Sequence, residues 1–85
     1  MKTSVRIINE SGKEALALIK FSPENNEDKT LLKKAVDLSL EEQADIDRIN
    51  DFIFASILSL NKGYQPLEAS EINPSFEAIV KVTSI

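Results

Sequence analysis

Hydrophobic and polar residues alternate near both ends of the chain, a pattern typical of β-strands with one buried face. In segment 2–9, the residues Thr3, Val5 and Ile7 fall on one side, and β-branched side chains favour extended backbone. Segment 76–85 alternates more strictly. The residues of its apolar side are Phe76, Ala78, Val80 and Val82. The pattern therefore predicts one strand at each end of the chain.

A turn follows the first strand, and the segment after it fits two kinds of element. Residues 10–13 form the turn, in which Gly12 is free to adopt positive φ. Residues 14–21 are rich in helix-forming Glu, Ala and Leu, and Ser11 with Glu14 matches a helix capping box. The run is short, however, and the first strand needs a partner. We expect 14–21 to complete a hairpin, with a helix as the alternative.

The middle of the chain has helical periodicity. A first helix is predicted to begin between Pro23 and Thr30 and to end near Leu38. Its apolar side consists of Leu31, Leu32, Ala35, Val36 and Leu38, and its lysines Lys29, Lys33 and Lys34 face water. Ser39 and Glu42 match a capping box, which predicts the start of a second helix.

The second helix is predicted over roughly 40–62 and is the clearest element of the sequence. Its apolar stripe consists of Ile46, Ile49, Ile53, Ile57 and Leu60. Acidic residues occupy its first turns, where the helix dipole favours anions, and Lys62 with Gly63 is typical of a helix C-terminus.

These elements predict an α+β fold in a single domain spanning residues 1–85. Segment 64–75 contains two prolines and has no helical or strand period, so we expect an irregular connection there. The element order is then β-β-α-α-β, with a small three-stranded, mainly antiparallel sheet and two helices packed on one face. The last strand is expected beside the first, which leaves two free sheet edges.

Composition narrows the classes of function. The chain has a net charge of −4 and contains neither cysteine nor histidine. The acidic balance argues against nucleic-acid binding, and the missing residues exclude disulfides, thiolate or imidazole metal sites and Cys/His nucleophiles. The first 20 residues lack the apolar core of a signal peptide, and the apolar stretch 53–60 is shorter than the ~20 residues of a membrane span. We expect a cytoplasmic protein with no membrane partner.

No group of residues has the spacing of a catalytic or metal site. Asp45, Asp47 and Asp51 superficially resemble a calcium loop, but Ile49 and Asn50 stand where a ligand and a glycine are required. The two glycines of the chain are too few for a phosphate-binding loop, and its serines have no histidine base. The sequence therefore predicts no enzyme, no cofactor and no bound metal.

Charge is concentrated in residues 37–51, which hold six acidic side chains against the single basic residue Arg48. Such a surface can steer a basic partner, although acids at a helix start and a solvated helix face explain the same run. An aromatic residue bordered by acids makes a plausible anchor. The residues predicted to bind a partner are Glu41, Asp45, Arg48, Phe52, Phe54 and Leu58.

Two further patterns favour self-association. Segment 52–60 is apolar on nearly all sides of the helix, so either the first helix and the 64–75 connection or a second subunit must cover its flanks. A second apolar group would form on the outer sheet face if the strand registers agree. Its members are Ile8, Leu16, Leu18 and Ile79. We expect a homodimer on the strength of the helix flanks and the free sheet edges. For the outer sheet group, scattered surface aliphatics are the preferred interpretation and sheet-on-sheet packing of a dimer is the alternative.

The sequence thus favours a non-enzymatic protein-interaction module of the adaptor, immunity or inhibitor type. One alternative is a small regulatory domain that binds a metabolite or nucleotide at a subunit interface, for which Arg6, Arg48 or a lysine would line the pocket. Another is a phage-type inhibitor whose acidic helix mimics nucleic-acid charge. The sequence does not identify the partner.

Overall fold

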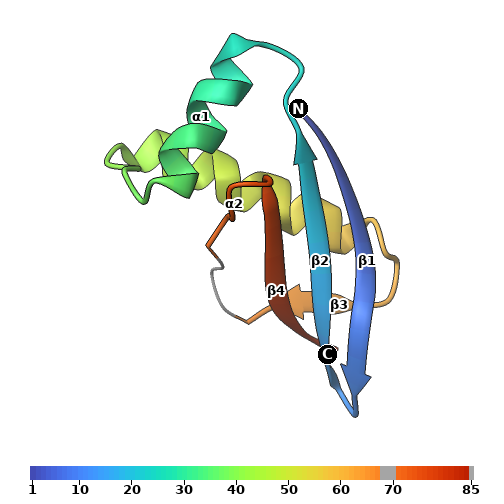
Figure 1. Ribbon diagram of the computed structural model, residues 1–85. Coiled ribbons are helices and arrows are strands. Elements are labelled where there is room, and N and C mark those ends of the chain that lie inside the picture. The colour runs from blue at the N-terminus through green and yellow to red at the C-terminus, as the bar shows by residue number, and fades with distance from the viewer. Residues whose placement is uncertain (68–70, 85) are drawn as a thin grey trace.

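The computed structural model describes residues 1–67 and 71–84, which adopt an α+β fold (Figure 1). Its elements are β1 (Lys2–Ser11), β2 (Glu14–Ser22), α1 (Asn26–Val36), α2 (Gln43–Leu58), β3 (Tyr64–Pro66) and β4 (Glu77–Ser84). The strands form one antiparallel sheet in the order β1-β2-β4-β3. The helix α2 crosses one face of this sheet, whereas α1 lies beyond the end at which β2 leaves it (Figure 1).

The predicted hairpin is confirmed, but the position predicted for the last strand is wrong. β1 and β2 pair around Gly12, which has a φ of +62°, so segment 14–21 is a strand and not a helix. β4 pairs with β2 instead of β1. The reason lies in the strand compositions. β2 is apolar on both faces, as central strands are, while β1 carries polar residues and a bulge between Ile7 and Asn9 that suit an edge.

The sheet has four strands, so the prediction of three is corrected. The additional strand, β3, lies in segment 64–75, which we expected to be irregular throughout. Its three residues pair with the end of β4, with Tyr64 opposite Ser84 and Pro66 opposite Val82. A strand of three residues is too short to produce a detectable period, and it ends with a proline, which edge strands tolerate. Pairing with β4 therefore defines this strand more than local sequence does.

Helix α1 begins inside the predicted interval and uses an asparagine as its N-cap. The side chain of Asn25 accepts a hydrogen bond from the Asp28 backbone N–H at 2.9 Å, which satisfies one free amide of the first turn. Lys29, Lys33 and Lys34 are exposed as predicted. Leu38 is not on the apolar side, because it follows the helix with a φ of +56° and is 70% exposed.

Helix α2 is shorter than predicted at both ends. Ser39 does not cap it, because the Ser39 hydroxyl donates to the Lys34 carbonyl and closes the end of α1. Glu42 occupies the N-cap position without a side-chain hydrogen bond to the helix. At the other end the helix stops at Leu58, and Asn61 adopts positive φ before Gly63 does. The expected capping box is therefore absent from α2, since its serine serves the preceding helix.

The core lies between α2, the end of α1 and the covered face of the sheet. The largest contribution comes from β2 and β4, whose inward residues alternate as the pattern requires. The buried apolar residues are Ala15, Ala17, Ile19, Phe21, Leu31, Leu32, Ala35, Ile49, Ile53, Ile57, Ile72, Ala78, Val80 and Val82. The Ser56 hydroxyl lies 2.7 Å from the Thr3 hydroxyl, and this contact fixes α2 against β1. The small alanines of β2 leave room for α2 to approach the sheet.

Candidate protein-docking surfaces

A buried carboxylate holds the start of the chain, α1 and α2 together. The Asp28 side chain is fully buried, and one of its oxygens accepts a hydrogen bond from Arg48 at 3.0 Å. Its other oxygen lies 2.9 Å from the Met1 amino nitrogen and accepts from the Glu24 backbone N–H at 3.1 Å. A buried carboxylate with this many donors is fully satisfied. Arg48, one of the predicted partner-binding residues, therefore already has an internal partner.

This network shifts the pKa values of both of its ends. Hydrogen bonds to Glu24 and Asp28 raise the pKa of the Met1 amino group above its ordinary value. The Met1 amino group and then the Glu24 backbone N–H lower the pKa of Asp28, against the opposing effect of burial. Both groups are thus held in their charged forms. Sequence reasoning missed Asp28, because an acid in the first turn of a helix is commonplace.

Two more of the predicted partner-binding residues face α1 or the core rather than open solvent. Asp45 lies 3.8 Å from the Lys34 ammonium of α1. Phe52 is half-buried and packs against the core, with the Arg48 guanidinium 5.9 Å from the centre of its ring. Glu41 is exposed, but it precedes the first residue of α2. The structure therefore does not place Glu41 and Asp45 on consecutive turns of one helix, as the longer predicted helix required.

The remaining two predicted residues lie on the solvent side of α2. Phe54 is 45% exposed and Leu58, one helical turn further, is 55% exposed. Asp47 and Asp51 are exposed on the same side, because residues three, four and seven apart share a helix face. We call these four residues the outer stripe of α2. The two aspartates were not among the residues predicted to bind a partner. Their spacing of seven and three residues from Phe54 is the sequence signal that places them on the same helix face.

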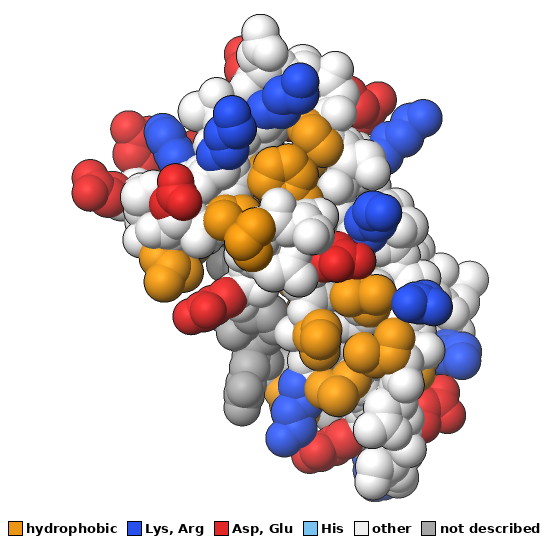
Figure 2. Space-filling model, in the orientation of Figure 1, with side chains coloured by type: hydrophobic (Ala, Val, Ile, Leu, Met, Phe, Trp, Pro, Cys, Tyr) orange, Lys and Arg blue, Asp and Glu red, His pale blue; other side chains and the backbone are white. Residues whose placement is uncertain are grey.

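The sheet face opposite α2 also carries apolar side chains. We call this the open face and define it by the outward residues of its two inner strands. They are Glu14, Leu16, Leu18 and Lys20 on β2 and Glu77, Ile79 and Lys81 on β4. The register places Leu18 opposite Ile79, as the sequence analysis required, while Ile8 lies in the β1 bulge and is 43% exposed. Figure 2 shows a hydrophobic cluster over this part of the sheet, with charged side chains around it.

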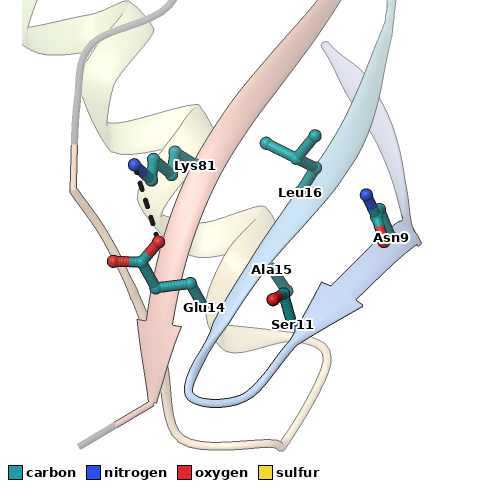
Figure 3. Close-up of a pocket in the computed structure, with 6 residues that line it drawn as sticks. All are labelled: Asn9, Ser11, Glu14, Ala15, Leu16 and Lys81. Carbon is teal, nitrogen blue, oxygen red and sulfur yellow. Dashed lines mark ion pairs between the residues drawn. The ribbon is translucent and has the colours of Figure 1, made fainter.

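A shallow hollow marks the hairpin end of the open face. It has a volume of about 220 Å³ and lies beside the bulge in β1. Glu14 and Lys81 point toward each other there, and the Lys81 Nζ lies 3.5 Å from the Glu14 Oε2. Asn9 and Leu16 are nearby (Figure 3). The hollow offers one ion pair that is already formed and no converging set of acid and base groups among the residues that line it. Its chemistry suits contact with a surface better than a reaction.

Within residues 1–67 and 71–84, no three acidic side chains come close enough together to hold a metal ion. None of the helices in those ranges is long and apolar enough to cross a membrane. Two of the cations near α1 already have acidic partners, since Arg48 pairs with Asp28 and Lys34 lies 3.8 Å from Asp45. An anionic metabolite would have to compete with these carboxylates. The two surfaces described above are thus the strongest candidate sites in the described chain.

Comparison of the chain with protein-family models, with curated proteins and with solved structures finds no significant match.

Proposed function

We propose that the chain is a non-enzymatic protein-interaction module that binds a basic partner through the outer stripe of α2. The observation that carries this proposal is the exposure of Phe54 and Leu58 on consecutive turns of one helix. An exposed aromatic and an exposed leucine at this spacing form the kind of helical ridge that enters an apolar groove on another protein. Single exposed aliphatics are common, whereas neighbouring exposed apolar side chains that form a contiguous patch can mark an interaction site.

The charges beside this ridge support a basic partner. Asp47 and Asp51 precede Phe54 along the outer stripe, and among the described residues no cation lies within ion-pair distance of Asp51. Asp47 accepts a hydrogen bond from Gln43 at 2.8 Å, which orders it without neutralising it. Uncompensated acids around an apolar ridge attract a positively charged groove and speed the encounter. Glu41 lies just before the same helix and adds to this negative field.

Parallel affinity capture from a lysate of the source cells tests the proposal. The wild-type chain is compared with a Phe54→Ser/Leu58→Ser double variant, with captured proteins quantified by mass spectrometry. We expect at least one basic protein to be retained by the wild type and lost from the double variant. The matched control is Leu67→Ser, which changes a residue of similar exposure outside α2 and outside the open face of the sheet.

The charge contribution is tested on the captured protein once it is purified. Reversing Asp47 and Asp51 to lysine should lower the association rate severalfold at low salt, while Phe54→Ser should mainly raise the dissociation rate. Glu10→Lys/Glu27→Lys, which changes the net charge by the same amount at sites outside α2, serves as the control for a simple change in net charge. A partner whose retention is unaffected by Phe54→Ser/Leu58→Ser would refute binding through the outer stripe.

A further inference from the structure

We infer that the open face of the sheet is an interface between two copies of this chain, related by a two-fold axis that crosses β2 near Ala17. This inference concerns the opposite side of the molecule from the outer stripe of α2 and stands independently of it. The open face is the side of the sheet turned toward the viewer in Figure 1, where neither α1 nor α2 covers it. A sheet with one covered and one uncovered apolar face commonly completes itself by packing on a second sheet.

The central strand carries a pattern that is complementary to itself. The outward residues of β2 are, in order, an acid, two leucines and a base: Glu14, Leu16, Leu18 and Lys20. A two-fold axis that crosses the strand at its middle reverses this order in the second copy. Glu14 then faces Lys20 of the second copy at one end, and Lys20 faces its Glu14 at the other. Between them the leucines of the two copies meet.

The neighbouring strand extends the same complementarity. Within one chain, Glu14 lies 3.5 Å from Lys81, and Lys20 stands directly opposite Glu77 in the register. Face-to-face packing brings these two oppositely oriented pairs together, so each end of the interface gathers two acids and two bases. Ile79 lies beside Leu18 in the register, and the same axis places it opposite the aliphatic stem of Lys81 of the second copy. The face therefore offers a second copy both an apolar centre and balanced charge at each end.

Pairing through the sheet edges is a poorer route to a dimer. β1 is the long free edge, but Lys2 and Arg6 lie along it and a bulge interrupts it between Ile7 and Asn9. Charged residues and bulges are the devices by which edge strands avoid pairing. The other edge, β3, has only three residues and ends with a proline. The open face differs, because its charged residues on β2 and β4 are of both signs and the leucines of β2 lie between Glu14 and Lys20.

The size of the face sets the expected affinity. Six residue steps along β2 span about 20 Å, and adjacent strands lie about 4.8 Å apart. Such a face is smaller than the roughly 800 Å² that each partner contributes to a standard stable interface. We therefore expect a weak dimer, with a Kd of about 1–100 μM.

Two charge-reversed variants of this chain test the proposed two-fold arrangement, and no other protein is needed. In Glu14→Lys the ends of the proposed interface place two bases against each other, and in Lys20→Glu they place two acids against each other. In sedimentation equilibrium, the dimer dissociation constant of each variant should be at least tenfold higher than that of the wild type. An equimolar mixture should form a heterodimer, because every base then faces an acid. In Glu14→Lys the new lysine also repels Lys81 of the same chain, but mixing the two variants does not change this repulsion. Recovery of the dimer in the mixture therefore reports on the interface alone.

Two matched variants separate the open face from the α2 surface. Ile79→Lys and Leu58→Lys alter side chains that are 52% and 55% exposed, on opposite sides of the molecule. Only Ile79→Lys should abolish the dimer, and circular dichroism of each variant verifies its fold. A monomeric wild type at about 100 μM would overturn the inference, since that is the weak end of the expected range. A mixture of the two charge variants that stays monomeric, or dimer loss in Leu58→Lys alone, would overturn it as well.

Discussion

At the scale of single residues, burial in α2 follows the helical period in its middle and departs from it at its ends. Ile49, Ile53 and Ile57 are buried as the stripe predicts, while Ile46 and Leu60 are only half-buried. The helical period predicts burial reliably where a residue of α2 packs into the core between the sheet and the end of α1. Near the helix ends there are fewer elements to pack against, and the sequence pattern does not contain that information.

The stripe leads to a stability prediction. Ile53 is 6% exposed, so truncation to alanine removes buried methylene groups and leaves a cavity. We expect Ile53→Ala to lower the free energy of unfolding by about 2–5 kcal/mol, a large part of the stability of so small a domain. Asp47→Ala, on the outer stripe, should change it by less than about 0.5 kcal/mol. Urea denaturation of the two variants provides the measurement, and equal losses would contradict the assigned helix phase.

At the scale of elements, the sequence identified both helices and three of the four strands, but it misassigned a helix start. Ser39 has the right spacing to Glu42 for a capping box, yet its hydroxyl closes α1 instead. Two adjacent helix ends compete for the same serine, and the connection between them decides the outcome. The short strand β3 escaped detection for a related reason, because pairing with β4 stabilises it and its own three residues carry no period.

The unequal caps of the two helices give a second prediction. Asn25 satisfies a backbone amide of α1 at 2.9 Å, whereas Glu42 makes no side-chain hydrogen bond at the start of α2. Asn25→Ala should therefore cost about 0.5–2 kcal/mol of folding free energy. Glu42→Ala should cost less than about 0.5 kcal/mol, as an ordinary surface substitution does. Thermal and urea melts of both variants test this, and a larger loss in Glu42→Ala would contradict the capping described for α2.

At the scale of the whole molecule, Asp28 links parts that are distant in sequence, and this link makes stability depend on pH. The lowered pKa of Asp28 means that its contribution is present at neutral pH and is lost as pH falls through the carboxyl range. The raised pKa of the Met1 amino group means that its contribution is complete below pH 8.0 and is lost as pH rises beyond that value. The free energy of unfolding should therefore decline both as the pH falls into the carboxyl range and as it rises above 8.0.

Asp28→Asn should flatten this profile. The variant loses the carboxylate that titrates in acid and one of the two carboxylates that hold the amino group, so its unfolding midpoint should vary less with pH at both ends. Its midpoint at neutral pH should also be lower, because Arg48 loses its charged partner. Glu27→Gln, an exposed change in the same helical turn, serves as the control. Identical pH profiles for wild type and Asp28→Asn would contradict this account.

The candidate surfaces were predictable only in part, for a geometric reason. Outward residues of a strand can be identified from alternation, but whether Leu18 and Ile79 adjoin depends on strand order, which the sequence did not determine correctly. Similarly, six residues predicted as one partner site divide between the α1 side and the solvent side of α2. Charge and apolarity can be read from sequence, whereas the neighbours that neutralise or cover a side chain cannot.

The placement of α2 on one side of the sheet has a consequence for valency. Two copies joined through their open faces carry their outer stripes on the two remote surfaces of the pair, directed away from each other. A single flat target cannot engage both stripes at once, so dimerisation adds no avidity toward it. The pair would instead hold two targets apart on either side of two stacked sheets, as a spacer whose thickness is fixed by the fold.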